Sequence, residues 1–114
     1  SVFRLYDQHD RCNIVLREQL IDKFAFREHL SKTVGGLSQG SLQKLKIILA
    51  VSGLREWLLL DEAFNGLDDA AILILNEIIT NSNRPLILVD HSNLCSLNDM
   101  VKIFIHSKKI CIEK

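Results

Sequence analysis

The sequence predicts an α/β fold, in which a helical segment is followed by a partly parallel sheet with flanking helices and a C-terminal β-hairpin. Two short apolar runs, 57–60 and 86–89, are hydrophobic on both faces, as are strands buried in a parallel sheet. A helical pattern separates the two runs, and the short links between these elements are typical of a βαβ unit. The length of 114 residues suits one small domain, so we expect a single module over 1–114.

The N-terminal part, about residues 14–53, is predicted to be helical. Leu16, Leu20 and Phe24 recur every four residues, which predicts an amphipathic helix over 15–30.

A second helix is predicted after the breaker Gly35-Gly36. Ser38 is typical of a helix N-cap, because its hydroxyl can accept a backbone N–H, and Gly53 ends the pattern. The second half of this helix, 47–51, is apolar on all sides and is expected to enter the core.

The C-terminal part, about residues 54–114, is predicted to hold the sheet. Its expected elements are a strand over 57–60 with Trp57 in the core, a helix from Asp68-Asp69 to about Thr80, a strand over 86–89, and a hairpin of 101–105 with 109–113.

Charge and composition exclude several classes of protein. The 14 lysine and arginine residues balance 14 aspartate and glutamate residues, so the basic excess of a nucleic-acid binder is absent and no nucleic-acid partner is expected. No apolar run approaches the ~18 residues of a membrane helix. Cys12, Cys95 and Cys111 form no CxxC pair, so we expect no zinc site and three buried, apolar thiols in a reducing cytosol.

Polar side chains follow both predicted strands. Asp61 and Glu62 come directly after the first strand, and His91 follows the second. The carboxyl ends of parallel strands meet at one edge of a sheet, where α/β proteins bind ligands, so we expect these side chains on one rim. Of two adjacent carboxylates, one can hold Mg²⁺ through water while the other activates a water. The alternative is a solvated strand end with a structural histidine.

The segment Leu37-Ser38-Gln39-Gly40-Ser41 lies at the start of the second predicted helix. A hydroxyl, a glycine and free backbone N–H groups at a helix start suit an anion. Taken alone, the same residues are a glycine-containing N-cap. We also expect His29 to be solvated, and Lys44 and Lys46 to form a solvated helix face.

Together the motifs resemble the C-terminal portion of an ATP-binding-cassette (ABC) transporter ATPase domain. The resemblance covers Val15 to the C-terminus and implies a P-loop NTPase-like fold with a signature motif, a Walker B motif, a D-loop and a switch histidine. The segments that carry it are, in order, 37–41 (LSQGS), 43–46 (QKLK), 58–62 (LLLDE), 66–68 (GLD) and 90–92 (DHS).

The resemblance implies that Ser38, Gln39 and Gly40 belong to the signature motif, which contacts the γ-phosphate of ATP held by the opposite subunit. This chain departs from the family's usual motif at two positions, since glycine is usual where Gln39 stands and glutamine where Ser41 stands. We expect Gln39 to crowd the approach of the backbone to phosphate.

The resemblance also implies roles for the rim. Asp61 is similar to the Walker B aspartate that acts on Mg²⁺ through water, and Glu62 to the general base. Asp68 is similar to the D-loop aspartate at the dimer interface, and His91 to the switch histidine that touches the γ-phosphate.

The Walker A motif, GxxxxGK[ST], is absent from the sequence. The nearest match begins at Gly35, but Ser41 stands where the lysine is required. Neither Tyr6 nor Gln8 replaces the family's adenine-stacking aromatic or Q-loop glutamine. We therefore expect a part of a longer ATPase, cut at Ser1, that binds ATP and Mg²⁺ only in the complete domain and is inactive alone.

The family's partners are a second ABC ATPase subunit, in a sandwich dimer, and a membrane permease. These partners imply a cytoplasmic location peripheral to the membrane, and an exposed strand edge also permits self-association. Two alternatives stay open: the C-terminal lobe of an SMC-like or DNA-repair ABC ATPase, and a non-catalytic ABC-like scaffold. An SMC-like lobe would follow a coiled coil, and no heptads precede Leu37.

Overall fold

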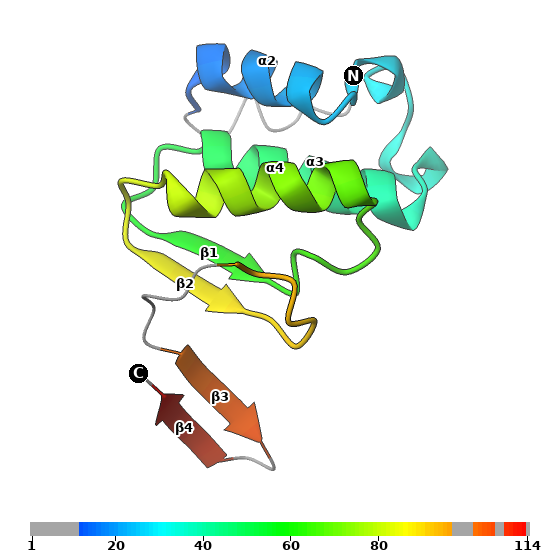
Figure 1. Cartoon of the computed structure of the whole chain (residues 1–114). Helices are drawn as coiled ribbons and strands as arrows, with labels where there is room; N and C mark the ends of the chain where they lie inside the picture. The colour runs from blue at the N-terminus through cyan, green and yellow to red at the C-terminus, as the bar shows by residue number, and fades with distance from the viewer. Residues whose placement is uncertain (1–11, 97–101, 107–108, 114) are drawn as a thin grey trace.

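The computed structural model describes residues 12–96, 102–106 and 109–113, with side chains over 12–96. The predictions for Tyr6, Gln8 and Val101 lie outside these ranges. Figure 1 shows helices α2 (Ile14–Lys23), α3 (Gln39–Ser52) and α4 (Asp69–Thr80), and strands β1 (Leu58–Asp61), β2 (Leu86–Val89), β3 (Lys102–His106) and β4 (Lys109–Glu113).

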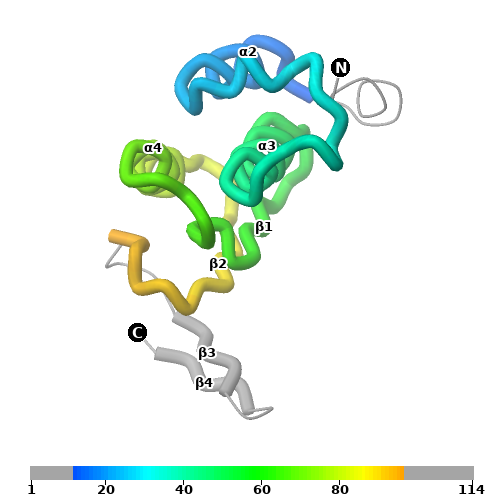
Figure 2. Tube along the Cα trace, turned by 90° about the vertical axis from the view of Figure 1, so that its right-hand side faces the viewer, coloured from blue at the N-terminus to red at the C-terminus, as the bar shows by residue number. Residues whose placement is uncertain are grey.

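Strands β1 and β2 pair in parallel, with Leu58 opposite Leu86 and Asp61 opposite Val89. Helix α4 connects them, so the predicted βαβ unit is confirmed. Helices α3 and α4 lie side by side over one face of this sheet, and α2 lies on the far side of α3 (Figure 2). Strands β3 and β4 form the predicted antiparallel hairpin.

The hydrophobic core lies between the helices and the sheet. The apolar second half of α3 supplies Ile47 and Ile48, both at most 1% exposed, as the sequence predicted. Leu75 of α4 and Leu58 of β1 are equally buried. Within the described residues, no helix has both the length and the apolar character needed to cross a membrane.

The expectation that β1 is buried on both faces is wrong. Leu58 and Leu60 are buried, but Leu59 between them is 60% exposed, and Trp57, expected in the core, is 57% exposed. Successive strand side chains point to opposite faces, and the described helices cover only one face of this sheet. Ile87, the neighbour of Leu59 on β2, is exposed on the same uncovered face.

The helix predicted over 15–30 ends at Lys23 in the structure. Ala25 has a φ of 53°, in the left-handed region. The Phe26 N–H donates to the Ile21 carbonyl oxygen at 2.8 Å, the hydrogen bond of a Schellman motif. This reversal places Phe26 in the core at 0% exposure, where Ile21 is also buried.

Ala25→Gly is expected to stabilise the chain by about 0.5–1 kcal/mol, because glycine adopts positive φ without the Cβ penalty. The free energy of unfolding in urea, followed by circular dichroism, measures this gain. Ala50→Gly in α3 is the matched control and should destabilise by about 1 kcal/mol, since glycine is unfavourable inside a helix. A loss of stability in Ala25→Gly would contradict the assigned backbone conformation.

Candidate functional site

Glu62 and His91 meet at the carboxyl edge of the parallel pair. The Glu62 Oε1 atom lies 3.2 Å from His91 Nε2, and the His91 backbone N–H donates to Glu62 Oε2 at 3.4 Å. The Glu62 side chain is 28% exposed and that of His91 is 66% exposed. Asp61, which precedes Glu62 and is the last residue of β1, is exposed to solvent. The carboxylate is therefore paired with the histidine on a rim that solvent reaches.

The backbone of Glu62 is held on both sides of the residue. Its N–H donates to the Val89 carbonyl oxygen at 2.7 Å, which extends the β1–β2 pairing by one residue. Its carbonyl oxygen accepts a 2.8 Å hydrogen bond from Gln43 Nε2 of α3. Glu62 has a φ of 51°, in the left-handed region, which is uncommon for a residue with a Cβ.

Ser38 is the N-cap of α3, as predicted. Its Oγ accepts the Ser41 N–H at 3.1 Å and donates to the Ser41 Oγ at 2.9 Å. Gly40, in the first turn of α3, lies close to the backbone of Gly66. A Cβ built on Gly40 would be only 2.9 Å from the Gly66 carbonyl oxygen. Gly40 therefore lets the start of α3 pack against the 62–68 loop.

Gln39 lies over Gly66, which has a φ of 77°. A Cβ built on Gly66 would be 3.4 Å from the Gln39 Cγ and 3.6 Å from its Nε2. Gln39 is itself solvent-exposed. Gln39 of the LSQGS segment therefore packs against Gly66 of the 62–68 loop.

His29 is not solvated, contrary to the expectation from sequence. Its side chain is 19% exposed, and its Nε2 lies 3.4 Å from the Ser41 Oγ and 3.4 Å from Glu28 Oε1. The sequence did not predict this contact. His29 and Ser41 are 12 residues apart, a 3₁₀ turn over Val34–Gly36 lies between them, and no periodic pattern relates the two positions.

Lys44 is also not a solvated side chain. It is 18% exposed, and its Nζ lies 3.2 Å from the Asp68 Oδ2. The Asp68 Oδ1 accepts the Ala71 N–H at 2.8 Å, which makes Asp68 the N-cap of α4. The bond from Ala71 and, after it, the bond from Lys44 lower the pKa of Asp68. The predicted D-loop residue is thus tied to both α3 and α4.

Because the pKa of Asp68 is lower in the folded than in the unfolded chain, its contribution to stability is present above the unfolded pKa of 3.8 and is lost as the pH falls through the folded pKa. Asp68→Asn keeps a capping oxygen without titrating there. We expect the wild type to lose stability relative to Asp68→Asn as the pH falls below about 4. Urea unfolding at a series of pH values measures the difference, and a constant difference would contradict the prediction.

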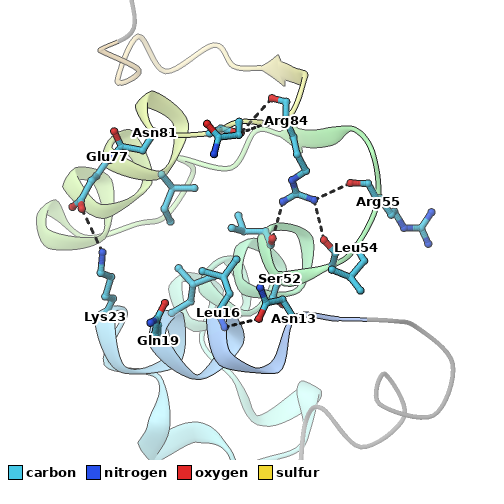
Figure 3. A pocket seen from close by; sticks show the side chains of 16 residues that line it. Asn13, Leu16, Gln19, Lys23, Ser52, Leu54, Arg55, Glu77, Asn81 and Arg84 are labelled. Atoms are coloured by element: carbon cyan, nitrogen blue, oxygen red, sulfur yellow. Dashed lines mark hydrogen bonds and ion pairs between the residues drawn. The ribbon is translucent and has the colours of Figure 1, made fainter.

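A cavity of about 510 Å³ lies between α2 and the C-terminal ends of α3 and α4 (Figure 3). The Lys23–Glu77 ion pair, at 3.4 Å, and the Arg84 guanidinium are part of its wall. None of its lining residues belongs to the predicted site. Sequence patterns did not indicate this cavity, because it forms where the ends of three elements meet.

The residues present suit a Mg²⁺ held mainly by water and phosphate oxygens. Within 12–96, no group of three His, Cys, Asp or Glu side chains is placed to hold a metal ion. Mg²⁺ bound next to phosphates commonly keeps several waters and takes only one or two protein carboxylates, which the exposed Asp61 satisfies. The sequence holds no GxxxxGK[ST] cradle for the nucleotide itself.

The β1–α4–β2 unit and its rim define a small α/β domain with a carboxylate–histidine pair. The chain is 33% identical to the uncharacterized ABC transporter ATP-binding protein YhaQ of Bacillus subtilis, over 68% of this chain and 30% of that protein. It is 32% identical to an uncharacterized ABC transporter ATP-binding protein of Alkalihalophilus pseudofirmus, over 71% of this chain and 30% of that protein. No family model matches the chain.

These similarities support an ABC ATPase-like relationship for the chain. The matched region spans about 30% of the length of each of these curated relatives.

Proposed function

We propose that this chain supplies the signature motif, the Walker B carboxylates and the switch histidine of an ABC transporter ATPase. The observation that carries the proposal is the Glu62–His91 pair, at 3.2 Å, on the carboxyl edge of two parallel strands. The similarity to two proteins named as ABC transporter ATP-binding proteins favours this function over an SMC-like lobe or a scaffold.

In this proposal Glu62 is the general base that accepts a proton from the attacking water, and His91 orients the Glu62 carboxylate and reaches the γ-phosphate. Asp61 holds Mg²⁺ through water. The bound Mg²⁺ neutralises charge on the phosphates. Water reaches the Glu62 carboxylate because its side chain is only partly buried.

The residues at the start of α3 are proposed to act on the ATP held by a second subunit, and not on the ATP beside Glu62 and His91. Ser38, Gln39 and Gly40 approach the γ-phosphate of ATP held by a second ABC ATPase subunit, and Asp68 lies at the interface of this sandwich dimer. The free N–H groups of the first turn of α3 suit an anion. The Gln39 side chain packs over Gly66 of the 62–68 loop.

Because the sequence holds no GxxxxGK[ST] motif, we propose that another polypeptide segment supplies the phosphate-binding loop and that the chain alone neither binds ATP appreciably nor hydrolyses it. A membrane permease is the further partner, and the location is cytoplasmic and peripheral to the membrane. The uncovered face with Leu59 and Ile87 is available to the remainder of the ATPase or, in the chain alone, to self-association.

A chimera tests the proposed function. The segment of YhaQ that aligns with this chain is replaced by the chain, and ATP binding and Mg²⁺-dependent hydrolysis are compared with those of unmodified YhaQ. We expect the chimera to hydrolyse ATP, with EDTA as the control that removes Mg²⁺. A folded chimera without turnover beside an active YhaQ would overturn the proposal, and ATP turnover by the 114-residue chain alone would contradict its dependence on a separate phosphate-binding loop.

A further inference from the structure

The left-handed backbone of Glu62 requires support from its surroundings. A non-glycine residue rarely adopts this conformation because its Cβ crowds the backbone, so neighbouring groups must hold it. The Val89 carbonyl holds the N–H side of Glu62, at 2.7 Å. On the carbonyl side, Glu62 accepts hydrogen bonds from Gln43 Nε2 of α3 at 2.8 Å and from the Asn65 N–H at 3.2 Å.

The Gln43 contact has a defined donor. The Glu62 carbonyl oxygen only accepts, so the group that faces it at 2.8 Å must be the Gln43 NH₂. Gln43 is partly buried on α3. The other donor to this carbonyl, the Asn65 N–H, belongs to the same 62–68 loop, so of these two donors only Gln43 ties the Glu62 carbonyl to α3.

We propose that Gln43 is a positioning residue for the proposed general base: it holds the Glu62 backbone in its left-handed conformation and so places the carboxylate on His91. The inference rests on the proposed function of Glu62. Because Gln43 and the N-cap Ser38 belong to the same helix, a displacement of the start of α3 is passed through this bond to Glu62. The bond therefore connects the signature segment with the base of the same chain.

Three variants separate the hydrogen bond from simple packing. Gln43→Met keeps the length of the side chain without a donor. Gln43→Asn keeps the amide but withdraws it by one C–C bond, about 1.5 Å. Gln43→Lys keeps a donor that can reach the carbonyl. Lys46→Ala, at an exposed position of the same helix, is the matched control.

The first measurement uses the 114-residue chain at a temperature where each variant is folded. A residue with positive φ has its amide and α protons close together, so the intraresidue NOE of Glu62 reports its conformation. We expect this NOE to weaken clearly in Gln43→Met and Gln43→Asn, together with loss of the contact to His91, and to stay strong in Gln43→Lys and Lys46→Ala. Asn93, with a φ of 60°, is the internal reference and should not change.

An unchanged Glu62 conformation in folded Gln43→Met or Gln43→Asn would overturn the proposal. Failure of all three Gln43 variants to fold, Gln43→Lys included, would also overturn it, because Gln43 would then be a structural residue of the core.

The second measurement is ATP hydrolysis by the YhaQ chimera. A misplaced base predicts that Gln43→Met lowers kcat about tenfold or more, with little change in KM and with recovery in Gln43→Lys. Loss of turnover in Glu62→Gln with normal turnover in Gln43→Met would overturn the role of Gln43 and leave the proposed function standing. Normal turnover in Glu62→Gln would instead overturn the proposed function, and the NOE would still decide whether Gln43 positions Glu62.

Discussion

Glu62→Gln is expected to reduce ATP turnover by the YhaQ chimera by about 10²- to 10⁴-fold, the range of a positioned general base. The carboxamide has nearly the same shape, so the hydrogen bonds of the Glu62 backbone to Val89 and Gln43 remain. The amide cannot accept the proton of the attacking water. Binding of ATP should be retained, so the variant should accumulate an ATP-bound dimer that elutes earlier in size-exclusion chromatography.

Glu56→Gln is the matched control for this substitution. Glu56 is exposed before β1, and its replacement makes the same change of charge away from the rim. Turnover by Glu56→Gln should equal that of the unsubstituted chimera. Normal hydrolysis in Glu62→Gln would show that Glu62 is not the base, whatever the state of the dimer.

General rules of chain geometry made part of this site predictable. Parallel strands end at one edge, so the positions of Glu62 and His91 after two apolar runs were sufficient to place them together. Capping is equally local: the hydroxyl of Ser38 and the carboxylate of Asp68 bond to an N–H three residues ahead, at Ser41 and Ala71.

The contacts that sequence reasoning missed depend on how separate elements pack. The bond from Gln43 to Glu62 joins residues 19 apart and forms only because α3 lies against the end of β1. Likewise, hydrophobicity alone identifies Leu59 as suitable for burial but does not show what covers it. Ala25 carries no signal for a left-handed turn, which is set by the burial of Phe26.

The Arg84 side chain donates hydrogen bonds to backbone carbonyl groups at the C-terminal end of α3, about 30 residues earlier in the chain. No sequence pattern indicates this interaction. Its Nη2 donates to the Val51 carbonyl oxygen at 2.6 Å, and its Nη1 donates to those of Gly53 and Arg55 at 2.9 and 3.1 Å (Figure 3). The last carbonyls of a helix have no partner within the helix. The planar Arg84 guanidinium binds that of Val51 in the last turn of α3, that of the C-cap Gly53, and that of Arg55 just beyond the helix.

Arg84→Met is expected to destabilise the chain by about 2–4 kcal/mol, because the stem is retained while the carbonyl oxygens lose charged donors. Arg84→Lys should lose about half as much, since one ammonium cannot reach all three oxygens in the planar arrangement of Arg84. Urea unfolding of both variants measures these losses, with Lys46→Ala as a control within about 0.5 kcal/mol of the wild type. If Arg84→Met stays within that margin, the three hydrogen bonds do not hold the end of α3, and its position must depend on the burial of Ile48 and Val51 alone.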